Sequence, residues 1–284
     1  DWSASRISFR YVPKPTIHGI HPSLGSVNGG TVVEIHGTDF LQESNLWCAF
    51  GNAGSVPAQW ISPMNISCIA PAVSYPENNT LSIHFGENSG FVDGTQQFAH
   101  HQELSLGDAS PMRGFVSGGT IVTVHGTGFI DVSTLSCQFG SVTVLAKFIS
   151  MNSIECPSPL VSQAKEVEMK VSLNGIDFSS LLVSSGRKLF GYDEEIELFH
   201  TIPSNIPVSR ANESSSSNAE HRRYISVIGS SIINTTSLSC RFGQNQLTFA
   251  QYVSESEVRC ILPEMTNAGE TEVRITLNGV DFSR

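Results

Sequence analysis

The six cysteines are the residues whose side chains could do the most varied chemistry, from disulfide formation to metal binding. They recur as three equivalent pairs. A repeated module must pair its cysteines in the same way each time, so the repeat narrows the many pairings that six cysteines allow. A structural zinc site would need closely spaced C-x-x-C pairs, which the sequence lacks, and buried free thiols are the remaining alternative. We predict three disulfides and therefore an oxidising compartment outside the cytosol. The predicted pairs, whose members lie 20, 19 and 20 residues apart, are Cys48 with Cys68, Cys137 with Cys156, and Cys240 with Cys260.

No motif for catalysis or cofactor binding accompanies the cysteines. The nine histidines form no H-E-x-x-H zinc motif, and the phosphate-binding loop, the nucleophile elbow and the dinucleotide fingerprint are all missing. The run Asp193-Glu194-Glu195, with Glu197 after it, has the carboxylates for a calcium site at a domain junction, but a solvated acidic edge is the commoner role of such a run. We therefore predict no catalytic residue, no cofactor and no metal site, in a protein that is not an enzyme.

Four N-x-[ST] sequons agree with the compartment that the cysteines indicate. A chain rich in Ser and Asn carries some sequons by chance, but a glycan needs an exposed loop, and Asn78 and Asn212 lie in polar, turn-rich stretches. We expect a glycoprotein of the secretory pathway, extracellular or at the cell surface. The predicted glycosylation sites are Asn65, Asn78, Asn212 and Asn234.

Composition excludes two classes of partner. The formal net charge of −10 over 284 residues argues against nucleic-acid binding, because a phosphate backbone needs a basic face. No apolar run approaches the roughly 20 residues that span a bilayer, so we expect no membrane contact within this segment.

Each cysteine pair sits in a longer pattern that is typical of β-structure. The first cysteine opens a C-x-F-G segment, an aromatic residue lies eight positions before the second cysteine, and a proline lies three positions after it. Two copies also carry a Gly-Gly turn followed by an alternating strand, at residues 28–40 and 117–129. Near-identical segments at 171–178 and 275–282 predict β-hairpins that turn at an Asn-Gly pair. No segment keeps a 3.6-residue apolar period, so we expect almost no helix.

The succession of G-G-T-x-V-x-[IV]-x-G-x-x-F, C-x-F-G and C-x-x-P resembles the immunoglobulin-like IPT/TIG domain. The third copy departs from this pattern, because a Ser-rich polar stretch at 209–223 replaces its Gly-Gly turn. The resemblance covers nearly the whole chain and implies an all-β fold of three tandem β-sandwiches, which short connections would stack into an elongated rod. The family occurs in plexins, in hepatocyte-growth-factor-type receptors and in Rel-type transcription factors, so the fold alone does not set a function. Acidic charge and paired cysteines count against the transcription-factor alternative.

The positions at which the repeated motifs fall divide the chain into four predicted segments. Residues 1–12 would be the closing strand of a preceding module, 13–101 the first domain, 102–192 the second, and 193–284 a degenerate third domain without its closing strand. An unclosed sandwich exposes an edge that invites another strand. We therefore expect an extracellular structural or adhesive protein, a stiff surface fibre or filament built by head-to-tail contacts with neighbouring copies or modules of the same protein. The alternative is a ligand-binding segment of a plexin-like cell-surface receptor ectodomain, whose partners would be other cell-surface proteins.

Overall fold

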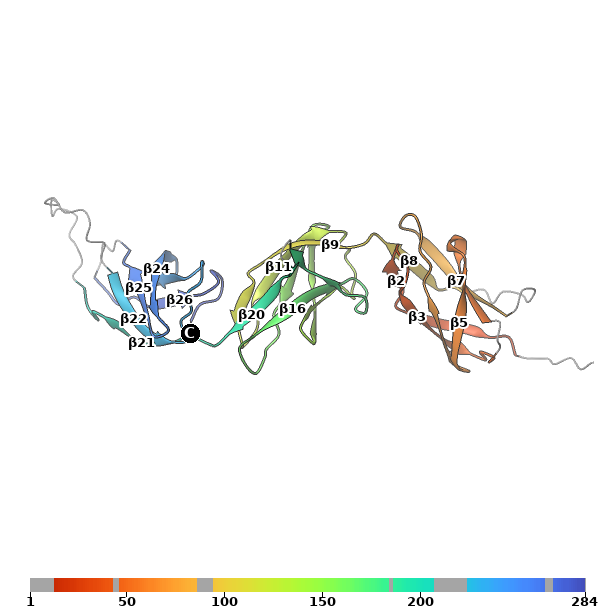
Figure 1. Ribbon diagram of the computed structural model, residues 1–284, viewed down its shortest axis with the longest axis horizontal. Coiled ribbons are helices and arrows are strands. Elements are labelled where there is room, and N and C mark those ends of the chain that lie inside the picture. The colour runs from red at the N-terminus through yellow and green to blue at the C-terminus, as the bar shows by residue number, and fades with distance from the viewer. Residues whose placement is uncertain are drawn as a thin grey trace, which may run out of the picture. The chain divides into compact units, whose positions relative to one another are not determined.

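The computed structural model is built from β-strands. It describes residues 13–42, 46–85, 94–183, 186–206, 224–263 and 268–283. Within these ranges there is no α-helix, as the missing helical periodicity predicts, and hence no helix long and apolar enough to cross a bilayer. Three immunoglobulin-like β-sandwiches, here called modules one, two and three, follow one another along the sequence (Figure 1).

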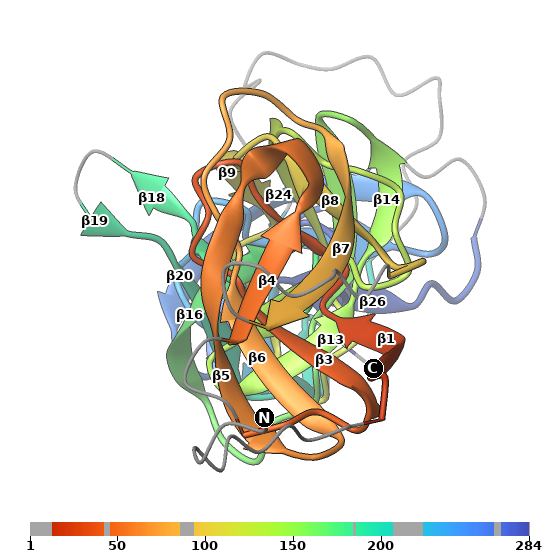
Figure 2. The same cartoon turned by 90° about the vertical axis from the view of Figure 1, so that its right-hand side faces the viewer.

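Module one shows how the alternating sequence makes a sandwich. In β3 (Val32–Thr38) the side chains of Val33 and Ile35 enter the core, while the residues between them face outwards. Strand β5 (Ser55–Ser62) pairs first with β4 and then with β6, so it joins the two faces, and β4 and β7 run side by side in Figure 2. The strand order is β1-β3-β6-β5-β4-β7-β8-β2. The remaining strands are β1 (Thr16–His21), β2 (Leu24–Ser26), β4 (Leu46–Phe50), β6 (Asn65–Ile69), β7 (Asn78–Phe85) and β8 (Gln97–His101).

Module two repeats this plan as two separate sheets. One sheet has the order β14-β15-β11-β9, and the other has the order β10-β20-β16-β12-β13, with β17 paired to β16. A short ribbon of β18 and β19 is appended. The strands are β9 (Ser105–Ser110), β10 (Arg113–Phe115), β11 (Ile121–Thr127), β12 (Ser136–Phe139), β13 (Val142–Leu145), β14 (Lys147–Ser150), β15 (Ser153–Pro157), β16 (Lys165–Ser172), β17 (Ser179–Ser180), β18 (Leu182–Val183), β19 (Gly186–Arg187) and β20 (Leu189–Asp193).

Module three forms one folded sheet of order β21-β22-β25-β24-β23-β26. Its long strand β24 pairs with β23 through its first half and with β25 through its second half, as β5 does in module one. The strands are β21 (Glu197–Ile202), β22 (Tyr224–Ser230), β23 (Ser239–Phe242), β24 (Gln246–Ser254), β25 (Glu257–Ile261) and β26 (Val273–Thr276).

The last strand of modules one and two lies between two partners. Strand β8 is antiparallel to β7 and parallel to β2, and β20 is antiparallel to β16 and parallel to β10. Among the described residues of module three, no strand takes this place beside β26. Residues 1–12, which the sequence analysis assigns to a closing strand, lie outside the described residues.

The chain divides into two compact units that do not follow the modules, because the first unit takes in two loops of module two. One unit comprises Asp1–Ser105, Val132–Thr134 and Ser172–Phe178, and the other comprises Leu106–Asp131, Leu135–Val171 and Ser179–Arg284.

Candidate functional site

The Asn-Gly segments of modules two and three do not make the tight hairpin turns that their sequence predicts. Strand β16 does turn back into β17, but through the longer loop 173–178. The reason is that Asn174 folds the loop with its own side chain: its Oδ1 accepts the backbone N–H groups two and three residues later at 3.0 and 2.8 Å. Gly175 supplies the positive φ of 76° that this path needs. Asn278 and Gly279 build the corresponding loop after β26 in the same way. We call 173–178 and 277–282 the clasp loops.

The clasp loop of module two binds module one inside the first unit. Asn174 Nδ2 donates a 2.9 Å hydrogen bond to the backbone carbonyl of Leu24, and Thr31 Oγ1 donates a 2.6 Å hydrogen bond to Asp177. Asn174 Nδ2 also donates to Asp177 at 2.8 Å, so the two loop side chains hold each other in place. Thr31 is only 2% exposed whereas Asp177 is exposed, so the donor side of this hydrogen bond alone is shielded from water.

The clasp loop of module three repeats these contacts on module two inside the second unit. Asn278 Nδ2 donates a 2.8 Å hydrogen bond to the carbonyl of Arg113, and Thr120 Oγ1 donates a 2.5 Å hydrogen bond to Asp281. Asn278 Nδ2 again donates to the aspartate of its own loop, at 2.8 Å. The same three hydrogen bonds therefore join two different pairs of modules.

A glycine makes room for each threonine of the clasp. A Cβ atom on Gly25 would stand 2.6 Å from Thr31 Oγ1, and a Cβ atom on Gly114 would stand 2.1 Å from Thr120 Oγ1. Both distances are far shorter than real carbon contacts, so any side chain at these positions would displace the threonine hydroxyl. In module three the corresponding position, three residues after the cis-proline, is Ile206, which packs against the core instead.

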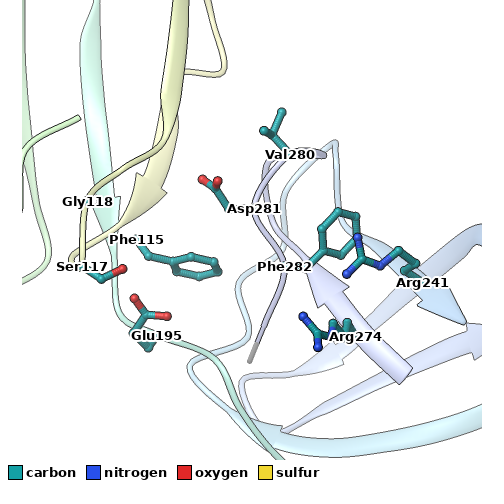
Figure 3. Close-up of a pocket in the computed structure, with 9 residues that line it drawn as sticks. All are labelled: Phe115, Ser117, Gly118, Glu195, Arg241, Arg274, Val280, Asp281 and Phe282. Carbon is teal, nitrogen blue, oxygen red and sulfur yellow. The ribbon is translucent and has the colours of Figure 1, made fainter. Parts of the chain in front are cut away.

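A pocket of about 340 Å³ lies beside the second clasp (Figure 3). Phe282 forms part of its wall and is stacked under Arg241, whose Cζ lies 3.8 Å from the ring centroid. Arg274 is held by Glu272 at 2.8 Å, whereas Arg241 has no ion pair with any residue that the structure describes. The lining residues are Phe115, Ser117, Gly118, Glu195, Arg241, Arg274, Val280, Asp281 and Phe282.

One wall of the pocket carries a carboxylate without a partner. Glu195 Oε1 is buried and makes no hydrogen bond within the described residues. In module one, the corresponding Glu103 accepts a 2.5 Å hydrogen bond from the amide of Asn28. Ser117 stands in the place of that asparagine in module two, and its side chain is shorter, which explains the orphaned oxygen.

The acidic run is only in part the solvated edge that its sequence indicates, because Glu194 and Glu197 are exposed whereas Asp193 is buried. Arg113 Nε donates a 2.9 Å hydrogen bond to Asp193, and a second guanidinium nitrogen pairs with the other carboxylate oxygen. These hydrogen bonds raise the pKa of Arg113. Glu194 accepts the backbone N–H of Ala164 at 3.1 Å. Across the described ranges, no three His, Cys, Asp or Glu side chains gather in a way that could hold a metal ion.

The structure forms the three disulfides that the repeat predicts, and each links the two faces of one sandwich. The Cα atoms are 6.4 Å apart for Cys48–Cys68, 6.1 Å for Cys137–Cys156 and 5.8 Å for Cys240–Cys260.

The sequons differ in their surroundings. Asn78 and Asn234 are exposed, whereas Asn65 is half-buried and its Oδ1 lies 2.7 Å from His36 Nδ1. Asn212 lies outside the described residues. Glycan attachment at these four positions stays a prediction.

The clasp was not anticipated from the sequence, although two signals pointed to it. The Asn-Gly-x-Asp motif is shared by modules two and three, and Gly-x₅-Thr is shared by modules one and two, at Gly25 to Thr31 and at Gly114 to Thr120. The threonine motif thus occurs in modules one and two, and the Asn-Gly-x-Asp motif occurs one module later, in modules two and three. This arrangement predicts a contact between modules, because it gives one module a hydroxyl donor and the next module a carboxylate acceptor.

Comparison with known proteins agrees with this repeat. A sequence profile of the IPT/TIG domain matches residues 15–99, 104–185 and 207–284. A structure of the full extracellular region of plexin A4 is 19% identical over 94% of this chain, which spans 23% of that structure, with a TM-score of 0.43. SGBP-B from a xyloglucan utilization locus of Bacteroides uniformis is 13% identical over 95% of this chain and 96% of its own, with a TM-score of 0.30. With nearly all of its length matched by the profile, the chain belongs to the IPT/TIG domain family.

Proposed function

We propose that this chain is a segment of a plexin-like cell-surface receptor ectodomain, in which clasped IPT/TIG modules present a protein-binding surface. Three disulfides support a location outside the cytosol, because such bonds persist in oxidising compartments. Exposed sequons at Asn78 and Asn234 fit passage through the secretory pathway. The proposed role is binding without catalysis.

The repeated clasp is the observation that carries this proposal. A receptor ectodomain must hold its binding surface in a defined place, and a flexible linker between modules would not do so. Asp177 and Asp281 each tie their own module to a threonine and, through their asparagine, to a backbone carbonyl of the preceding module. Such contacts hold loop 173–178 against module one inside the first unit and loop 277–282 against module two inside the second unit.

A fibre remains the second candidate, because the outer edge of β26 is only partly covered. Thr276 bridges Phe282 and Ser283 N donates to the carbonyl of Ile275. Among the described residues, no strand pairs with this edge at residues 273–274, and an unpaired edge is able to accept a strand from another copy. In this arrangement the partner is a neighbouring copy, bound head to tail, and such a contact propagates into a filament.

Two measurements on the purified full chain test these candidates, the first through the clasp and the second through self-association. Spin labels carried by non-canonical amino acids at exposed Leu160 and Val253 report the distance between modules two and three without disturbing the disulfides. The receptor proposal expects one narrow distance distribution, which broadens in Asp281→Ala. An equally broad distribution in the unmodified chain would remove the support for the proposal.

Sedimentation over a wide range of protein concentrations tests the fibre. The receptor segment stays monomeric, whereas a fibre grows with concentration. Growth that Thr271→Pro abolishes and Thr271→Val preserves would favour the fibre, because proline removes a backbone donor from the segment that leads into β26.

A further inference from the structure

Module three exposes two large apolar side chains on the outer face of one strand. Leu247 and Phe249 lie two residues apart on β24 and are 60% and 65% exposed. Ala250 faces the core, so the alternation of the strand points Leu247 and Phe249 outwards together. Neighbouring exposed apolar residues of this size are a mark of interaction surfaces.

Arg241, which makes no ion pair with any described residue, lies next to Leu247. The register pairs Arg241 on β23 with Leu247, and residues that face each other across an antiparallel pair share one face of the sheet. Arg274 faces Arg241 from β26 but is already paired with Glu272. Arg241 rests on the ring of Phe282 and has no carboxylate partner among the described residues. We call Arg241, Leu247 and Phe249 the β24 face.

The other two modules provide an internal comparison, because their registers place different residues at these positions. Module one sets Ala49 opposite Ser55, with Pro57 in the place of Phe249. Module two sets Gln138 opposite Thr143, with Leu145 in the place of Phe249. The combination of a cation with two large apolar side chains is therefore found in module three alone, so the common fold does not require it.

We propose that the β24 face binds an acidic segment of a partner protein that also carries apolar side chains. This inference rests on the proposed function and names where the receptor segment would hold its partner. A guanidinium pairs with carboxylates in a planar, two-pronged geometry, and Leu247 and Phe249 would cover the partner's apolar side chains. Because the chain has a net charge of −10, an acidic segment is repelled by most of the molecule and attracted where Arg241 lies without a carboxylate partner among the described residues.

Fluorescence anisotropy on the full chain tests the proposal with a labelled peptide that alternates Glu with Phe and Leu. The charge-inverted control peptide has Lys in place of every Glu. We expect the acidic peptide to bind and the basic one not to bind. Arg241→Gln, Leu247→Thr and Phe249→Leu together install the residues of module two, and this variant should weaken binding by about tenfold or more. Leu145→Phe in module two, beside Gln138, should leave binding unchanged.

Folding does not confound this test, because Leu247 and Phe249 are exposed and can be changed without Arg241. Leu247→Thr with Phe249→Leu should keep the melting temperature and still weaken binding. Equal affinity in this variant, or equal binding of the basic peptide, would overturn the β24 face but leave the receptor proposal standing. Binding of heparin instead of the acidic peptide would also overturn it, because the partner would then be a sulfated glycan. A concentration-dependent fibre that binds neither peptide would defeat both proposals.

Discussion

Thr120 donates its hydroxyl hydrogen to the carboxylate of Asp281 at 2.5 Å, and Thr31 does the same to Asp177 at 2.6 Å. Both threonines are at most 2% exposed, whereas Asp177 is exposed and Asp281 is half-buried, so only the donor side of each bond is shielded from water. Removing either aspartate would leave a buried threonine hydroxyl without its partner, which costs more than the net value of the bond itself. The hydrogen bond therefore stabilises the contact of each clasp loop with the preceding module.

A side chain at Gly114 should weaken the second clasp. In Gly114→Ala the new Cβ would meet Thr120 Oγ1 at 2.1 Å, so the threonine must move and its bond to Asp281 must lengthen. We expect a loss of about 1 to 3 kcal/mol in the free energy of unfolding, as for other overpacked sites. Chemical denaturation measures it. Gly107→Ala is the matched control, because its nearest non-neighbouring atom is 3.4 Å away and ordinary contact results. Equal losses in the two variants would argue against a clasp-specific effect.

The ion pair of Arg113 with Asp193 should contribute to the stability of module two. Arg113→Met leaves the carboxylate of Asp193 buried without its main partner, and we expect a loss of about 2 to 3 kcal/mol near neutral pH. The double variant with Asp193→Leu removes both charges and should recover most of that loss. A single variant as stable as the unmodified protein in thermal unfolding would show that water already screens the pair.

The sequence predicted the fold through three independent signals that agree. The cysteine spacing and the C-x-F-G segment recur at equivalent places in all three sandwiches and the Gly-Gly turn in the first two, where Gly29 and Gly118 have the positive φ that the turn requires. The clasp was missed because Asn-Gly is a strong local hairpin signal, whereas the role of Asn174 depends on Leu24, far away in the sequence. Local patterns do not reveal such a contact until the modules are placed side by side.

The hydroxyl of Tyr192 should contribute nothing to stability. It is buried without a hydrogen-bond partner among the described residues, and burial raises the pKa of Tyr192 to about 12. Tyr192→Phe removes the unpaired polar atom but keeps the ring that packs on Phe190, so stability should stay within about 1 kcal/mol or rise. Absorbance titration should also lose the most alkaline tyrosine transition. A marked destabilisation would mean that the hydroxyl has a partner in solution.

Module one should lose stability in mild acid because of His100. This residue is 3% exposed, and burial lowers its pKa from 6.5, opposed by the hydrogen bond to the carbonyl of Pro71 and by Glu77. The unfolded chain therefore takes up the proton at higher pH than the folded chain. Stability is complete above the unfolded pKa and falls as the pH drops through 6.5 towards the lowered folded value.

Thermal unfolding of module one at about pH 7.5 and about pH 5.5 measures this contribution. His100→Gln keeps a polar side chain but does not titrate, so its melting temperature should fall less between the two pH values. An identical fall in both proteins would assign the acid sensitivity to other groups.

A double-mutant cycle at the second junction tests the clasp most directly. Thr120→Val removes the donor of the bond at constant side-chain size, and Asp281→Ala removes the acceptor. The two changes should be strongly non-additive in the free energy of unfolding of the second unit, with a coupling of about 1 to 2 kcal/mol. The pair Thr120→Val and Asp177→Ala, whose residues make no contact with each other, should be additive. Additive effects of Thr120→Val and Asp281→Ala, within about 0.3 kcal/mol, would contradict the claim that this bond locks module three to module two.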